Sequence, residues 1–287
     1  MSLAITILGC GSSGGVPRLG GGWGDCDPAN PKNRRRRCSI LVERAEAAGP
    51  KTIVLVDTSP DLREQLLGQG IDRLDGILIT HPHADHVHGM DDVRPLVMHN
   101  RKRIDIHMDE GTSATVTATF GYIFRTPPES LYPALLNECR LTDGRVCEIS
   151  GPGGTVSALP FRLNHGEIDA LGFRFGDIAY TPDVKAIPDA SLPALENLDL
   201  WIIDALRHQP HPSHLSLSES LAWIARMKPR RAVLTNMHTD LDYATLRGIL
   251  PDNVEPAFDG MRIGGADFLT GTGKCDTMQF SHLFRYG

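Results

Sequence analysis

Long apolar runs are missing from this 287-residue chain, and none approaches the ~20 residues that a membrane-spanning helix requires. A surplus of basic charge is also missing, because 29 Lys and Arg against 35 Asp and Glu give a net charge of −6. A net acidic chain disfavours general binding to nucleic acid or anionic membranes, although a local basic patch could still bind. With 41% hydrophobic and 22% charged residues, the composition is that of a globular protein that needs no disulfide staples.

A cationic leader and a small-residue cleavage site are absent from the first residues. The apolar stretch from Met1 to Leu8 runs directly into Gly-Cys-Gly, so we expect no secretory signal and a cytoplasmic protein. The six cysteines are scattered, and in that compartment we expect reduced thiols. They are Cys10, Cys26, Cys38, Cys139, Cys147 and Cys275.

Internal repeats and Pro/Ser-rich linkers are also missing, which favours a single domain over residues 1–287. Short apolar, β-branched runs alternate with helical patterns along the chain, and several are apolar throughout. This predicts an α/β fold in which helices cover the sheets. The predicted strands are 4–8, 39–42, 52–56, 77–80, 104–108, 156–163, 172–175, 178–180, 198–204 and 232–235.

Two helices have clear boundary signals. Ser59 and Pro60 predict a helix start, and Gly68 predicts its end. Ser216 and Glu219 form a Ser-x-x-Glu capping box before an amphipathic run. Further helices are predicted over 89–98, short or kinked at its proline, and over 243–250, with glycine-rich loops over 9–24 and 151–154.

The densest group of potential metal ligands is the sequence His-Pro-His-Ala-Asp-His at residues 81–86, directly after a predicted strand. Polar sites form where strands end in short loops, and imidazole and carboxylate groups are ligands for zinc and similar cations. Because adjacent residues point in different directions, His81 and His83 suit one ion, and Asp85 with His86 suits a second. The alternative for this segment alone is a solvated, His-rich turn.

Three more candidate ligands follow apolar runs in distant parts of the chain. They are His165, Asp183 and His238, each just beyond a predicted strand. Each alone would more often be an ordinary loop residue, but the ends of several strands can meet at one pocket. Together with residues 81–86 they complete a predicted two-metal site.

This pattern of His-x-His-x-Asp-His after a strand, with a later His, Asp and His, resembles the metallo-β-lactamase superfamily over nearly the whole chain. The resemblance implies a four-layer αββα sandwich and two divalent metal ions, zinc first and manganese as the alternative. It also counts Asp85 among the catalytic residues. The implied ligands are His81, His83 and His165 for the first metal, Asp85, His86 and His238 for the second, and Asp183 as the bridge.

Further residues narrow the branch of that superfamily. An aspartate at 183 resembles the phosphodiesterase, glyoxalase and lactonase branches and disfavours antibiotic hydrolysis, and His83 disfavours the redox iron chemistry of the flavodiiron branch. Residues 9–17, 38–40 and 56–58 are similar to the carbon–phosphorus lyase accessory phosphodiesterase group. The resemblance implies a hydrolase of small, cyclic or nucleotide-like phosphodiesters, in which two metal ions share a water and supply it as hydroxide.

Other functions remain open. The tRNA 3′-processing endonucleases have a similar opening sequence, but no long Gly/Pro-rich arm is obvious here. The same metal centre also suits thioester or lactone hydrolysis, and a metal-binding assembly protein of the same fold is the non-enzymatic alternative. The resemblance implies a homodimer, no membrane partner, and nucleic acid as a less favoured partner than a small phosphodiester.

Supporting roles are expected for several residues outside the ligand set. His214 best matches a histidine that contacts the phosphate or the leaving oxygen in similar proteins, so we predict catalytic and substrate-binding roles for it. For His208 and His211 we expect exposed positions. Asp57 and Asp204, at strand ends, could accept hydrogen bonds from ligating imidazoles, or each could instead favour the helix start that follows it.

The run from Arg34 to Arg37 is the strongest charge block. Four guanidinium groups could bind phosphate or RNA, but we favour a solvated run or pairing with local acids. The resembled group holds a structural zinc with closely spaced cysteines, whereas Cys26 and Cys38 have eleven residues between them, so we favour unpaired thiols. Gly9 to Gly15 does not match a nucleotide-binding fingerprint, and we expect it to let backbone approach the metal pocket.

Overall fold

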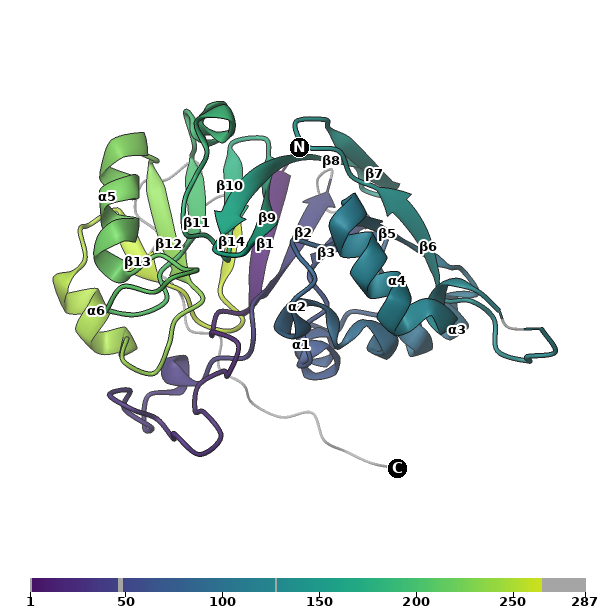
Figure 1. Cartoon of the computed structure of the whole chain (residues 1–287), viewed down its shortest axis with the longest axis horizontal. Helices are drawn as coiled ribbons and strands as arrows, with labels where there is room; N and C mark the ends of the chain where they lie inside the picture. Colours follow the sequence, from purple (N-terminus) through teal and green to yellow (C-terminus); the bar gives the residue numbers. More distant parts are fainter. Residues whose placement is uncertain (1, 46–48, 127, 265–287) are drawn as a thin grey trace.

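The computed structural model describes residues 2–45, 49–126 and 128–264, which form two seven-stranded sheets packed face to face (Figure 1). Helices α5 and α6 cover the outer face of one sheet, and helices α1, α3 and α4 cover that of the other. The predicted four-layer αββα sandwich is therefore confirmed. Cys275 lies outside the described residues, and no helix within them is long and apolar enough to cross a membrane.

The first sheet has the strand order β14-β1-β2-β3-β4-β5-β6. Its pairs are antiparallel from β14 to β3 and parallel from β3 to β6. The parallel half requires helical crossovers, which are supplied by α1 (Leu62–Gly68), α2 (Ala84–Val87), η2 (Met90–Val93), α3 (Arg94–Asn100) and α4 (Glu110–Phe124). The strands are β1 (Ser2–Gly9), β2 (Ser39–Ala45), β3 (Lys51–Val56), β4 (Gly76–Leu78), β5 (Ile104–Met108), β6 (Leu136–Arg140) and β14 (Arg262–Gly264).

The second sheet has the order β13-β12-β11-β10-β9-β8-β7 and repeats this plan. Its pairs are antiparallel from β7 to β10 and parallel from β10 to β13. The crossovers contain η3 (Asp189–Leu195), α5 (Leu217–Met227) and α6 (Tyr243–Ile249). The strands are β7 (Cys147–Gly151), β8 (Gly154–His165), β9 (Ile168–Phe175), β10 (Ile178–Thr181), β11 (Leu200–Asp204), β12 (Arg231–Thr235) and β13 (Val254–Pro256).

The strands of the first sheet send alternate side chains to its two faces, as a two-residue period requires. In β3, Val54 and Val56 belong to the core that includes the facing sheet, whereas Ile53 and Leu55 pack with the helices. Strands β2, β3 and β4 of this sheet are thus packed on both faces. Burial on both faces also explains why these strands are apolar almost throughout.

Several element boundaries differ from the sequence-based prediction. Helix α1 begins at Leu62 with Asp61 as its N-cap. The hydroxyl of Ser59 accepts from the amide of Asp61 at 3.2 Å and donates to Gln65 Oε1 at 2.9 Å. Strand β4 ends two residues early because the Thr80 amide donates to the carboxylate of Asp57 at 2.8 Å. Residues 151–154, predicted as a loop, form the tight hairpin turn between β7 and β8. The capping box of α5 is confirmed.

Members of the arginine run 34–37 form ion pairs with acidic residues of the protein. Arg36 and Arg37 form ion pairs with Asp259 and Asp61, each at 3.0 Å. This confirms the favoured pairing with local acids for these two residues. Arg34 is exposed.

Arg35 of this run is buried, with 2% of its surface exposed. Its Nη2 donates to the carbonyl of Leu241 at 2.6 Å, and its Nη1 donates to the carbonyl of His238 at 3.1 Å. A single guanidinium therefore fixes the backbone that carries one of the predicted metal ligands.

Replacement of Arg35 by alanine should lower the free energy of unfolding by about 2–4 kcal/mol, because the buried Leu241 carbonyl loses its donor and a cavity is left. Denaturant unfolding of the two proteins measures the change. The exposed Arg34 is the matched control, and its alanine variant should stay within about 0.5 kcal/mol of the wild type. Equal stability of the two variants would contradict the structural role of Arg35.

Candidate functional site

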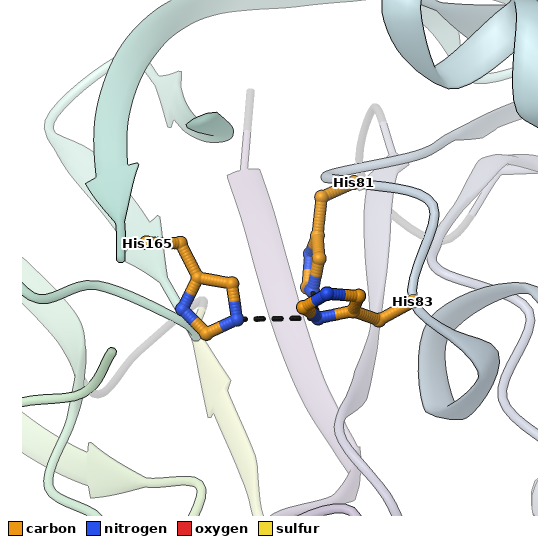
Figure 2. Close-up of side chains that lie close together, drawn as sticks. All are labelled: His81, His83 and His165. Atoms are coloured by element: carbon orange, nitrogen blue, oxygen red, sulfur yellow. Dashed lines mark hydrogen bonds between the residues drawn. The ribbon is translucent and has the colours of Figure 1, made fainter. Parts of the chain in front are cut away.

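The histidines that follow β4 lie beside the histidine that ends β8, as Figure 2 shows. Nδ1 of His83 is 3.0 Å from Nε2 of His81 and 3.2 Å from Nε2 of His165. Three ring nitrogens from two different sheets therefore face one point. This is the group predicted for the first metal ion.

A second group of ligand atoms lies next to the first. Nε2 of His86 is 3.2 Å from Oδ1 of Asp183 and 3.4 Å from Oδ2 of Asp85. The other oxygen of Asp183 lies 3.7 Å from Nε2 of His165 and 3.9 Å from Nε2 of His81. Asp183 thus lies between the two groups, where a bridging carboxylate is predicted.

His238 lies apart from these groups. It lines the same cavity, but its Nε2 accepts a hydrogen bond from Nη1 of Arg18. Among the described residues it joins no group of three ligand atoms within 4.8 Å, whereas His214 forms such a group with His165 and Asp183. The predicted role of His238 as a ligand of the second metal therefore stays a prediction.

The residues present fit divalent cations, on the evidence of two buried atoms. Nε2 of His86 and Oδ1 of Asp183 are inaccessible to solvent and have no hydrogen-bond partner, although they lie 3.2 Å apart. A buried polar atom without a partner costs roughly 1–3 kcal/mol. A cation between an imidazole nitrogen and a carboxylate oxygen would satisfy both atoms at once.

The charge states of three histidines of the cluster suit ligation, whereas His86 holds a proton that a cation would have to displace. Burial lowers the pKa of His81, His83 and His165, so these imidazoles are neutral at pH 7, which is the form that binds metal. Burial opposes charge on His86, but Asp183 and other carboxylates raise its pKa well above the usual value. Burial likewise opposes charge on Asp183, but His86 holds the pKa of that carboxyl well below its usual range.

The candidate ligands are oriented by hydrogen bonds on their far sides. The carboxylate of Asp57, fully buried at the end of β3, accepts from Nδ1 of His86 at 2.8 Å. This is the contact expected of a carboxylate that fixes the tautomer of a ligating imidazole. Nδ1 of His165 lies 2.7 Å from the carbonyl of Ser213. That second contact could not be predicted from residue types, because every residue carries a carbonyl.

Asp204 orients His214 and contacts none of the predicted ligand imidazoles. Its Oδ2 accepts from Nδ1 of His214 at 3.0 Å and from the amide of Val184 at 3.1 Å. Burial would lower the pKa of His214, but Asp204 raises it to about 9. Burial raises the pKa of Asp204 to about 6, although His214 opposes that shift. An imidazolium therefore lies at the edge of the candidate metal cluster.

One cavity of about 280 Å³ is lined by six of the residues described above, namely His83, Asp85, His165, Asp183, His214 and His238. Its wall also contains residues that the sequence did not single out, among them Arg18, Arg207 and Ser12. His211 lines the cavity and is half-buried, so its predicted surface position is wrong, whereas His208 is exposed as expected. The loop after β11 turns back toward β8 and carries His211 inward.

The two cysteines of the first long loop lie within protein contacts. Cys26 is buried and its sulfur is 3.9 Å from Nη1 of Arg35. Cys38 is buried and donates to the carbonyl of Gly11 at 3.5 Å. The five cysteines of the described residues are free thiols, as expected.

Comparison with known sequences identifies relatives of several kinds. Residues 52–237 match the family described as a beta-lactamase superfamily domain. The chain is 31% identical over 260 residues to an octanoyltransferase of Porphyromonas gingivalis, covering 89% of this chain and 50% of that protein. It is 29% identical over 147 residues to a ribonuclease Z of Bradyrhizobium sp., covering 50% of this chain and 46% of that protein. The chain thus spans about half the length of the curated relatives it matches.

Among solved structures, a diphosphatase of the PhnP family is 35% identical, with a TM-score of 0.81 over 92% of this chain and 98% of that one. Zinc-bound PqqB from Methylobacterium extorquens is 16% identical, with a TM-score of 0.69 over 91% and 99%, and it shares the fold. The family match extends over more than half of the sequence and over the strands that carry the candidate ligands. The chain therefore belongs to the metallo-β-lactamase superfamily.

Proposed function

We propose that this protein is a metal-dependent phosphoric diester hydrolase that acts on small, cyclic or nucleotide-like phosphodiesters. The proposal depends most on the cluster itself, in which neutral imidazoles from two sheets surround the unpartnered atoms of His86 and Asp183. Membership of the superfamily supports a metal-dependent hydrolase, and the similarity to a PhnP-family diphosphatase supports a phosphoryl substrate.

The proposed ligands are those of the sequence prediction. Three histidines would hold one ion, an aspartate and two histidines would hold a second, and Asp183 would be shared. Zinc is the first choice and manganese the second, because imidazole and carboxylate serve both. Such ions lower the pKa of a water molecule and neutralise charge on phosphoryl oxygens. The ligands are His81, His83 and His165 for the first ion, and Asp85, His86 and His238 for the second.

The other residues of the cavity bind the substrate and move a proton. His214 lines the cavity, and its raised pKa keeps it protonated at neutral pH, so it can donate a proton to the departing oxygen. Asp204 holds that imidazolium in place through the bond to Nδ1. The cavity volume of about 280 Å³ lies at the small end of ligand pockets, which favours a small substrate.

The second candidate function is cleavage at tRNA 3′ ends, favoured by the similarity to ribonuclease Z proteins. That similarity covers 50% and 56% of this chain. A net charge of −6 also works against binding of a long polyanion. A precursor tRNA therefore belongs in the substrate panel, with S-lactoylglutathione and acyl-lactones for the thioester and lactone alternatives.

Zinc- or manganese-loaded protein should hydrolyse bis(p-nitrophenyl) phosphate, and chelation should abolish the activity until metal is restored. The His83→Ala variant should lose at least about 100-fold, because its Nδ1 lies within the ligand cluster. His99, an exposed histidine on α3, is the matched control and should tolerate alanine. Activity that survives complete removal of metal would refute the proposal. Faster turnover of a thioester, lactone or tRNA than of the phosphodiester would show that the proposed substrate class is wrong.

A further inference from the structure

Arg18 is held at the cavity by the loop between β1 and β2. Its amide donates to the carbonyl of Gly22 at 2.8 Å, and the amide of Gly22 donates back to the carbonyl of Arg18 at 2.9 Å. The side chain packs closely over the same loop, since a Cβ on Gly14 would lie 2.6 Å from Nε of Arg18. The loop therefore fixes the arginine at both its backbone and its stem.

The guanidinium of Arg18 contacts a predicted metal ligand. Nη1 donates to Nε2 of His238. A nitrogen that binds a cation has no lone pair left for this hydrogen bond, and a guanidinium and a metal ion repel each other. With His238 as a ligand of the predicted second ion, the donors of Arg18 would be free for another acceptor in the cavity that Arg18 already lines.

Ser12, on the same loop, supplies a second and independent observation. Ser12 lines the cavity, only 4% of the residue is exposed, and its buried Oγ has no hydrogen-bond partner. A buried hydroxyl without a partner is costly unless a ligand satisfies it. The nearby Arg207 adds positive charge to the wall, although its Nε and Nη2 are used by the carbonyls of Gln209 and Pro210.

We propose that Arg18, together with Ser12, binds the non-bridging oxygens of the substrate's phosphoryl group. The two side chains offer a planar fork of N–H donors and one O–H donor, which match the oxygens of a tetrahedral anion. A neutral thioester or lactone offers no such charge. Arg18 is thus a specificity-determining residue that favours phosphoryl substrates, an inference that rests on the proposed function.

The test measures binding of inorganic phosphate to metal-loaded protein by calorimetry, without turnover. Arg18→Ala should weaken phosphate binding by about 10- to 100-fold. Arg18→Lys should restore part of the affinity, because the lysine ammonium supplies a positive charge but lacks the planar fork of donors. Ser12→Ala should weaken it by a smaller factor. Metal content, measured by elemental analysis, should equal that of the wild type, and Arg34→Ala is the matched control, because this exposed arginine lies outside the cavity.

Two results would overturn the inference. One is phosphate binding by Arg18→Ala as tight as that of the wild type. The other is loss of metal from the same variant, which would make Arg18 a positioning residue for His238. Failure of the wild type to hydrolyse phosphodiesters would instead refute the proposed function, and the phosphate measurement separates the two because it needs no reaction.

Discussion

Replacement of Asp183 by asparagine should reduce hydrolase activity by at least about 1,000-fold, together with loss of bound metal. Asp183 is the residue whose two oxygens approach both groups of candidate ligands, at 3.2 Å from His86 and 3.7 Å from His165. The amide keeps the shape of the side chain but removes its charge and one of its acceptor oxygens. It also leaves the buried His86 without its strongest neighbouring charge.

Elemental analysis and steady-state kinetics on the same samples measure both parts of this prediction. Asp177→Asn is the matched control, because Asp177 is 68% exposed at the turn between β9 and β10. If the Asp183→Asn variant kept its metal and its full activity, Asp183 would not be a bridging ligand. Loss of metal without loss of activity would show that the reaction does not use the cluster.

The candidate ligands could be predicted because their signal is local. A dense run of ligand residues at 81–86 follows an apolar strand, and each later candidate follows another strand with several buried apolar residues. Strand ends are recognisable from burial patterns alone. The meeting of these ends at one edge follows from the parallel pairing within half of each sheet, which was not predicted from the sequence.

The contacts that complete the site could not be predicted, because they depend on where loops return. The Ser213 carbonyl that contacts His165 has no residue type to mark it, and Arg18 stood in a glycine-rich loop without a partner nearby in sequence. Both members of the Asp204–His214 pair were predicted to have supporting roles. Only the structure showed that they contact each other.

The secondary structure that was missed shares a physical cause. Helix α4 is rich in threonine and has a weakly amphipathic sequence, and β-branched residues lower helix propensity. Strand β6 buries little besides Leu136, and β14 contains three residues. Such elements are held in place by neighbours in the sheet or the layer above, so their own sequences carry little signal.

Substitution of His214 by glutamine should lower kcat by about 10²–10⁴-fold for a phosphodiester with an alkyl leaving group. The loss should be much smaller for bis(p-nitrophenyl) phosphate, because a nitrophenolate departs without a proton. His208→Gln is the matched control, since His208 is exposed in the same loop. Equal losses for both leaving groups would contradict proton donation and leave His214 as a phosphate-binding residue.

The pH dependence of this step follows from the Asp204–His214 pair. Burial opposes the charge on His214, but Asp204 raises its pKa to about 9, so the imidazole carries its proton below that pH and loses it above. A rate that needs this proton therefore falls as the pH rises through that value. Asp204→Asn removes the carboxylate charge, which should lower the pKa of His214 and move the fall in rate to lower pH. NMR titration of the imidazole in metal-free wild type and variant measures the pKa directly, and an unchanged value in the variant would show that Asp204 does not hold the proton.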